Sequence, residues 1–228
     1  MALELVVFDM DDTLYLERDY VRSGFAAVGS TLELKYDVHG FAPRAWRAFL
    51  NGTRGNTFNL VLGEILGAEG SELVGECIDI YRNHSPDIAL LEDARDMLQY
   101  VGSRFRTALI TDGPASSQSA KAMALDLYRT LDRVILTDEF GAAAGKPSPL
   151  TFRALQEEFG ISGDQCIYIG DNPAKDFAAP VALGWATWRV RRPLSLHQLI
   201  ETDNPATVTT RGLDPSEDFR LNLLFGAP

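Results

Sequence analysis

Short apolar segments that alternate with helical patterns constrain the fold of this chain most strongly. Each segment has the length of a buried β-strand, and most are followed by a stretch in which apolar residues recur at helical spacing. Strands are predicted at Leu5–Phe8, Thr107–Ile110, Val134–Leu136, Ile167–Ile169 and Thr187–Val190, and helices at Glu92–Tyr100, Ser116–Leu125, Pro149–Phe159 and Lys175–Leu183. The alternation predicts an α/β fold with a doubly wound parallel sheet.

About ninety residues separate the first predicted strand from the second, far more than one crossover requires. Helical spacing recurs in this interval at Tyr20–Leu34, Pro43–Phe49, Thr57–Leu66 and Glu72–Arg82. We therefore expect a Rossmann-like core formed by residues 1–15 and 89–228, and a small helical cap domain formed by residues 16–88. After Arg191 the sequence predicts only a short strand at Thr207–Thr210 and a helix near Pro215–Leu224.

The charge of the chain argues against several classes of partner. It has 21 Lys and Arg against 32 Asp and Glu, a formal net charge of -11, so we expect neither a nucleic acid polymer nor an acidic membrane as partner. The sequence has no run of 18 apolar residues and no signal-peptide pattern. Cys77 and Cys166 are too few for a disulfide framework. We expect a cytoplasmic protein.

Acidic residues follow the ends of the predicted strands. Asp9 and Asp11 come after the first strand, Thr111 ends the second before an Asp-Gly turn, and Asp171 follows the fourth. Ligands of open parallel sheets bind beyond the carboxyl ends of the strands. Three carboxylates gathered there would repel one another unless a proton or a cation neutralised them. Oxygen ligands suit a hard cation, so the sequence predicts a Mg²⁺ site at this edge.

Each of these pieces also has an ordinary structural explanation. An Asp at a strand end commonly caps a turn or a helix, so a lone Asp-x-Asp pair is catalytic in roughly one case in ten. Thr111 by itself would start a turn, and Lys146 before Pro147 would be a surface lysine. Their order along the chain, each at or after a predicted strand, favours one common site.

The ordered set Asp9-Met10-Asp11-Asp12-Thr13, Thr111, Lys146-Pro147 and Gly170-Asp171 through Asp176 resembles the four signature motifs of the haloacid dehalogenase superfamily. The resemblance extends from residue 4 to about residue 190, and the insertion lies where the first cap class of that family has its helical cap. It implies that Asp9 is a nucleophile that forms an aspartyl-phosphate. It also implies that Asp11, initially protonated, protonates the leaving oxygen and then deprotonates the attacking water.

The resemblance further implies a metal site and its supporting residues. Mg²⁺ would be held by the Asp9 carboxylate, the backbone carbonyl of Asp11 and the Asp171 carboxylate. Lys146 would lie against Asp9 and the phosphoryl oxygens, where its charge stabilises the transferring group. Asp176 would orient Lys146 or support the metal, although capping the helix predicted to begin near Lys175 explains this residue equally well.

Phosphate binding is assigned by the same resemblance to the second motif. Thr111 would donate a hydrogen bond to a phosphoryl oxygen, and the backbone N–H groups of Asp112 and Gly113 would assist. Many relatives have Asn where this chain has Asp112, so a carboxylate is expected near the bound phosphate and its role stays open.

Asp11 separates the reactions of the superfamily. Displacement of a halide needs no proton on an oxygen leaving group, and the dehalogenases lack an acid at this position. The resemblance therefore implies a phosphatase that hydrolyses a small phosphomonoester, such as a sugar phosphate or a nucleoside monophosphate. A phosphomutase shares the first half-reaction, and the sequence separates the two poorly.

Two loops of the expected cap are candidates for substrate recognition. Asn51–Asn56 carries Arg54, and Tyr81–Pro86 carries His84. We hypothesise that both side chains contact the part of the substrate that does not react. The competing explanation, an exposed arginine and a histidine at a hinge without a ligand, has slightly more weight on sequence grounds.

Two other classes of function remain as alternatives. A non-catalytic binding module typically loses a nucleophile or a metal carboxylate, and the full set is present here, which leaves this reading about one chance in twenty. A glycosidase would use two carboxyl groups on either side of a sugar bond. It would have no use for Lys146 or Mg²⁺.

Overall fold

Six parallel strands form the sheet of the protein, in a computed structural model that describes residues 2–201 and 207–226. The strands are β1 (Leu5–Phe8), β2 (Arg106–Thr111), β3 (Arg133–Leu136), β4 (Cys166–Gly170), β5 (Ala186–Val190) and β6 (Thr207–Thr210). Their order is β3-β2-β1-β4-β5-β6, which places β1 between β2 and β4. The predicted α/β fold class with a parallel sheet is confirmed.

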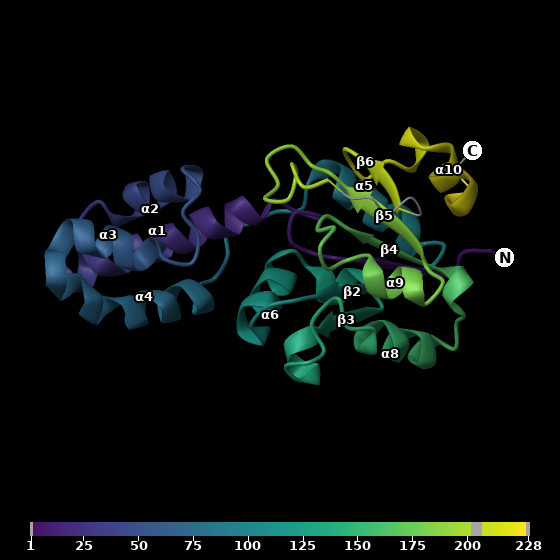
Figure 1. The fold of residues 1–228 in the computed structure, drawn as a ribbon, viewed down its shortest axis with the longest axis horizontal. Helices are drawn as coiled ribbons and strands as arrows, with labels where there is room; N and C mark the ends of the chain where they lie inside the picture. The colour runs from purple at the N-terminus through teal and green to yellow at the C-terminus, as the bar shows by residue number, and fades with distance from the viewer. Residues whose placement is uncertain (1, 202–206, 227–228) are drawn as a thin grey trace. The chain divides into compact units, whose positions relative to one another are not determined.

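Helices that connect these strands, and one that follows the last strand, pack on both faces of the sheet (Figure 1). They are α5 (Glu92–Gly102), α6 (Ala115–Ala124), α7 (Leu127–Thr130), α8 (Leu150–Phe159), α9 (Ala178–Ala182) and α10 (Phe219–Phe225). Short 3₁₀ turns occur at Thr137–Phe140, Gly163–Gln165 and Pro215–Glu217.

The helix predicted to begin near Lys175 is shorter than expected, because α9 begins at Ala178. The N–H groups of Lys175 and Asp176 both donate to the carbonyl of Asn172, which closes a turn ahead of the helix. The Asp176 side chain in turn accepts the N–H of Asn172 at 2.8 Å. Residues 175–177 therefore belong to this turn; the predicted helix is confirmed over Ala178–Ala182, and its predicted start is wrong.

The core lies on the two faces of the sheet. On one face, Phe152 of α8 meets the rings of Tyr168 and Trp185 edge to face, with centroids 5.1 and 5.5 Å away. On the other face, Trp188 of β5 packs against Phe225 of α10, and the hydroxyl of Tyr100 in α5 donates to the carbonyl of Phe225. Burial of apolar side chains on both faces fixes the strand ends relative to one another.

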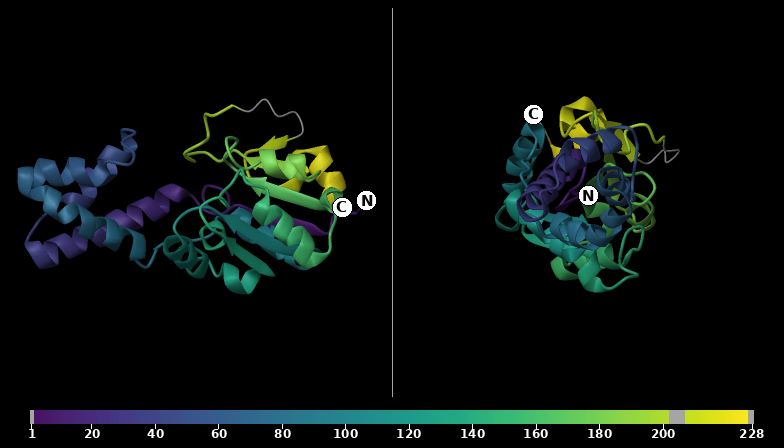
Figure 2. Two further views of the ribbon diagram at one scale, coloured as in Figure 1. Left: turned by 60° about the horizontal axis from the view of Figure 1, so that its bottom comes forward. Right: turned by 90° about the vertical axis from the view of Figure 1, so that its left-hand side faces the viewer.

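Residues Asp19–Ile88 form a second compact unit, which is helical. Its helices are α1 (Glu17–Tyr36), α2 (Phe41–Leu50), α3 (Thr57–Leu66) and α4 (Gly70–Asn83), with a 3₁₀ turn at Gly67–Glu69 (Figure 2). Aromatic rings of Phe25, Phe41, Phe58 and Tyr81 meet inside it.

The chain leaves the sheet unit after β1 and returns to it ahead of α5. Where it returns, the N–H of Leu91 donates to the carbonyl of Leu14 at 3.0 Å. Among the described residues, the sheet unit comprises those up to Arg18 and those from Ala89 onward, and the role of residues 16–88 as a cap stays a prediction. Among the described helices, none combines the length and the hydropathy that crossing a bilayer would require.

We predict that Phe152→Ala lowers the free energy of unfolding by about 3–5 kcal/mol, because it removes a fully buried ring and leaves a cavity between α8 and the sheet. Leu150→Ala, at a half-exposed position of the same helix, should change it by less than about 0.5 kcal/mol. Urea denaturation followed by circular dichroism measures both. Equal losses in the two variants would contradict this description of the core.

Candidate active site

The carboxyl ends of three neighbouring strands bring the predicted residues together. Asp9 follows β1, Thr111 ends β2 and Asp171 follows β4. The N–H of Asp9 donates to the carbonyl of Ile169 at 2.8 Å, so the pairing of β1 with β4 continues to the point where the acidic residues begin. Their proximity follows from the strand order, since β1 lies between the other two strands.

Lys146 lies at the centre of this edge, with its side chain fully buried. Its Nζ is 2.5 Å from Asp9 Oδ1, 2.8 Å from Asp176 Oδ1 and 2.8 Å from the hydroxyl of Tyr168. Burial alone would lower the pKa of Lys146, but the neighbouring Asp176 and Asp9 raise it well above its ordinary value. The lysine is therefore a permanent buried cation.

Asp9, Asp171 and Asp176 form a buried group of carboxylates. One oxygen from each lies within 4.8 Å of the others. Burial raises the pKa of Asp9 to about 8, against the opposing effect of Lys146, and burial also raises the pKa of Asp171. Such carboxylates favour a further positive charge beside them. The donor set, made of carboxylate oxygens, fits a hard divalent cation such as Mg²⁺.

Asp11 takes a position that the sequence did not indicate. Its carboxylate accepts hydrogen bonds from Lys121 Nζ at 2.8 and 3.0 Å, from Gln118 Nε2 at 3.1 Å and from the hydroxyl of Tyr15. Burial would raise the pKa of Asp11, but Lys121 and these hydrogen bonds together lower it. In this arrangement the Asp11 carboxyl group is ionised. The role expected for Asp11, protonation of the leaving oxygen, requires the protonated form at the start of the reaction.

Asp12 has a structural part in the loop after β1. Its φ of 55° lies in the left-handed region, which Asp tolerates better than most residues. Its two carboxylate oxygens accept the N–H groups of Glu17 at 2.9 Å and Leu196 at 2.7 Å. Burial raises the pKa of Asp12 to about 6. This carboxylate ties the loop to a later segment of the chain.

Thr111 and Gly113 shape the end of β2. The Thr111 hydroxyl is buried and has no hydrogen-bond partner among the described residues, which suits a group that awaits an acceptor from a ligand. Gly113 has a φ of 131°, and a Cβ at this position would lie 2.6 Å from the amide nitrogen of Gln118. The backbone angle favours glycine, and a larger residue would also have to displace the end of the Gln118 side chain.

Asp112 turns its side chain toward the protein. Its Oδ1 accepts the hydroxyl of Thr137 at 2.9 Å and the backbone N–H of Lys146 at 3.1 Å, and its Oδ2 is 3.3 Å from Lys175 Nζ. Burial would raise the pKa of Asp112, but Lys146 and Lys175 lower it. The carboxylate therefore holds the loop that carries Lys146, while its expected contact with substrate stays a prediction.

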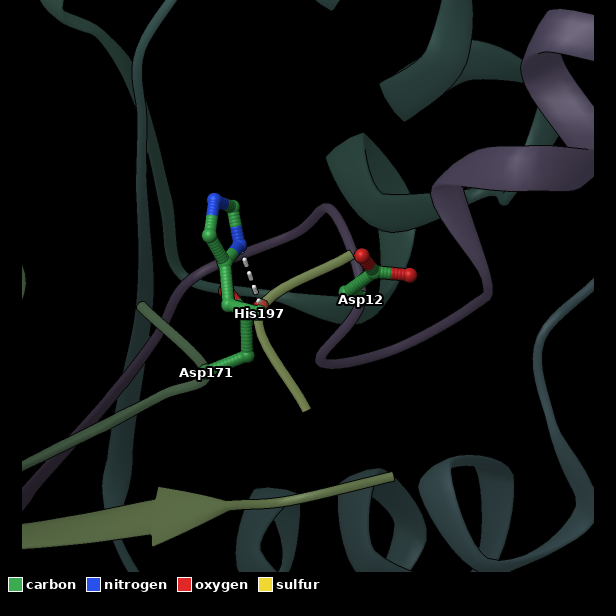
Figure 3. Close-up of side chains that lie close together, drawn as sticks. All are labelled: Asp12, Asp171 and His197. Atoms are coloured by element: carbon green, nitrogen blue, oxygen red, sulfur yellow. Dashed lines mark hydrogen bonds and ion pairs between the residues drawn. The ribbon is translucent and has the colours of Figure 1, made fainter. Parts of the chain in front are cut away.

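His197 is a neighbour of the site that the sequence analysis missed. Its Nδ1 lies 3.0 Å from Asp171 Oδ2, and Figure 3 shows the ring directed at that carboxylate, with Asp12 nearby. No sequence motif marks His197 as a residue of the site. The sequence did contain a signal for Gln118 and Lys121. They share a helical face with the apolar Ala122 and Leu125, and because an apolar face packs toward the protein interior, these polar side chains point inward as well.

Arg54 and His84 belong to the helical unit, where each has local partners. Arg54 lies 3.9 Å from the centre of the Phe49 ring and donates to the carbonyls of Phe49 and Thr53. His84 is buried, and its nitrogens lie 2.7 Å from the Tyr81 carbonyl and 3.0 Å from the Ser23 hydroxyl. These contacts explain both residues structurally, and contact with a substrate stays a prediction.

Comparison with known proteins agrees with the geometry. A family model described as haloacid dehalogenase-like hydrolase matches residues 3–184. The chain is 25% identical over 227 residues to glyceraldehyde 3-phosphate phosphatase of Methanocaldococcus jannaschii, an alignment that covers 96% of this chain and 97% of that protein.

Solved structures share the fold. A hydrolase of the same superfamily from Geobacter sulfurreducens superposes with a TM-score of 0.69 at 17% identity, covering 97% of this chain and 96% of that one. A magnesium-bound hydrolase of the superfamily from Bacillus subtilis gives 0.64 at 17% identity, with 99% of each chain covered. The chain is an enzyme and belongs to the haloacid dehalogenase-like hydrolase family.

Proposed function

We propose that this hydrolase is a Mg²⁺-dependent phosphatase that hydrolyses a small phosphomonoester through an aspartyl-phosphate on Asp9. The contact of the buried Lys146 Nζ with Asp9 Oδ1 at 2.5 Å carries the proposal. A phosphate dianion needs positive charge at the site where it reacts, and the surface of this chain, with its net charge of -11, does not supply it. The buried lysine brings that charge to the nucleophile.

The residues that would hold Mg²⁺ are the carboxylates of Asp9 and Asp171 and the backbone carbonyl of Asp11. Support for this set comes from the close approach of three carboxylates. One oxygen from each of Asp9, Asp171 and Asp176 lies within 4.8 Å of the others. When bound, Mg²⁺ would offset the charge of the phosphate and of these carboxylates. Asp176, paired with Lys146 at 2.8 Å, keeps the lysine directed at Asp9.

The proposed reaction has two steps on Asp9. In the first, a carboxylate oxygen of Asp9 attacks phosphorus, the P–O bond to the alcohol breaks, and Asp11 gives the leaving oxygen its proton. In the second, Asp11 takes a proton from water, which attacks the phosphorus and releases phosphate and free Asp9. Lys146 and the Thr111 hydroxyl bind the phosphoryl oxygens in both steps.

Asp11 must change partners during this cycle. Asp11 is ionised and paired with Lys121. This is the form that takes a proton from water in the second step. Before the first step it has to exchange that ion pair for a proton and contact the leaving oxygen instead.

The proposed substrate class is a sugar phosphate, with nucleoside monophosphates as the second choice. Support comes from the archaeal relative named glyceraldehyde 3-phosphate phosphatase, which aligns over almost its whole length. We propose that residues 16–88 act as a cap over the phosphate site and that Arg54 and His84 contact the remainder of the substrate. Such closure shields a reactive intermediate from bulk water.

Asp9→Asn is predicted to lower kcat by at least about 1,000-fold, because the amide cannot form the acyl phosphate. Release of phosphate from a sugar phosphate measures kcat, and Asp96→Asn, at an exposed position of α5, is the matched control. An Asp9→Asn variant that turns over like the parent would contradict the proposed nucleophile.

Removal of divalent cations with a chelator is predicted to abolish turnover, and Mg²⁺ added in excess of the chelator should restore it. Circular dichroism before and after the chelator checks that the fold persists. Full activity in the chelated protein would exclude the proposed metal site.

Arg54→Ala and His84→Ala are predicted to raise KM for the preferred compound more than they lower kcat, because the proposed contacts lie away from the reacting phosphorus. The preferred compound is first identified from a panel of phosphorylated metabolites assayed with Mg²⁺, with Asp9→Asn as the blank. Unchanged KM and kcat in both variants would remove these residues from the substrate site. Better turnover of phosphopeptides than of any small phosphate would contradict the proposed cap.

A further inference from the structure

The segment from Arg191 to Ile200 packs against the predicted metal-binding loops, although it lies beyond the residues 3–184 that match the family. The N–H of Leu196 donates to Asp12 at 2.7 Å. Arg192 donates to the carbonyl of Thr13 at 2.8 Å and pairs with Asp93 at 2.8 Å. The segment is therefore anchored to the loop that follows β1 and contains Asp12 and Thr13.

Arg189 fixes the same segment to Asp171. This side chain is buried at the end of β5. Its Nε donates to the backbone carbonyl of Asp171 at 3.1 Å, and its Nη2 donates to the backbone carbonyl of His197 at 2.9 Å. One rigid guanidinium thus sets the distance between the backbone of Asp171 and that of His197.

The imidazole of His197 completes the connection. Its Nδ1 is 3.0 Å from Asp171 Oδ2, and its Nε2 is 3.2 Å from Asn172 Nδ2. The neutral tautomer with the proton on Nδ1 satisfies both contacts, since Nδ1–H then donates to the carboxylate and Nε2 accepts from the amide. Oδ1 of Asp171 has no hydrogen bond among the residues that the structure describes, so it is available to a cation.

We propose that His197 is a positioning residue, which holds the Asp171 carboxylate in the orientation that Mg²⁺ requires; this inference rests on the proposed function. Groups that hydrogen-bond a metal-binding side chain fix its geometry, and their loss typically costs metal affinity. Here the backbone of Asp171 is held by Arg189 and one of its carboxylate oxygens by His197.

Direct coordination by His197 is the competing arrangement, because Asp12, Asp171 and His197 each offer one atom within 4.8 Å of the others. Two features favour positioning. Both oxygens of Asp12 already accept backbone N–H groups, and the two ring nitrogens of His197 are engaged with Asp171 and Asn172. A metal bound by the ring would have to displace one of the two hydrogen bonds of His197.

The test is direct binding of Mg²⁺ alone, measured by isothermal titration calorimetry on the full chain. We expect His197→Ala to raise the Kd for Mg²⁺ by about 10- to 100-fold. His197→Asn, whose amide nitrogen occupies nearly the place of Nδ1, should bind close to the parent value. His39→Ala, at an exposed histidine of the helical unit, is the matched control and should leave the Kd unchanged.

A second measurement separates positioning from a general loss of structure. The Mg²⁺ concentration that gives half-maximal turnover should rise in His197→Ala, while kcat at saturating Mg²⁺ returns toward the parent value. If His197→Ala does not fold, as judged by circular dichroism, His197→Leu, which fills the space of the ring but makes neither hydrogen bond, should show the same rise in the Kd for Mg²⁺.

Three results would overturn the inference. A folded His197→Ala protein that binds Mg²⁺ like the parent would remove the positioning role and leave the proposed function intact. A His197→Asn protein as weak as His197→Ala would show that the ring itself is required, as in direct coordination. A parent protein that binds no Mg²⁺ would remove the metal from the proposed function as well.

Discussion

The buried ion pairs of Lys146 are the interaction on which the site depends. A lysine without access to water is stable only when anionic groups surround it, and Asp9 and Asp176 fill that requirement. The two acids follow different strands, and the lysine comes from a third part of the chain. Asp112 secures the arrangement, because it binds the backbone N–H of Lys146 as well as the side chain of Lys175.

Positive charge is concentrated at this point in an acidic chain. Lys121, Lys146 and Lys175 each pair with a carboxylate that belongs to one of the strand-end motifs. A local group of cations inside an acidic protein attracts a small anion that can enter the site, while the outer field still repels large polyanions. The three lysines offset part of the charge of the carboxylates around them, and the carboxylates that remain suit the proposed cation.

The sequence predicted the strands and the acidic residues that follow them because both depend on local patterns. Apolar runs of strand length locate β1 and β4, and the parallel order then gathers Asp9 and Asp171 at one edge. The contacts of Lys121 and His197 depend on how a helix face and an irregular segment pack, which no short motif encodes. The helix after β4 begins three residues later than predicted because Asp176 closes a turn with Asn172 ahead of it.

The hydrogen bond between Leu91 and Leu14 closes the excursion of the chain at its base. The entropy of closing a loop grows only with the logarithm of its length, so helices can be added to or lost from this excursion at small cost to the sheet. The helical unit can thus change in size while the residues at the strand ends keep their places. A chain interrupted at this point can therefore vary in its helical unit without rebuilding its sheet.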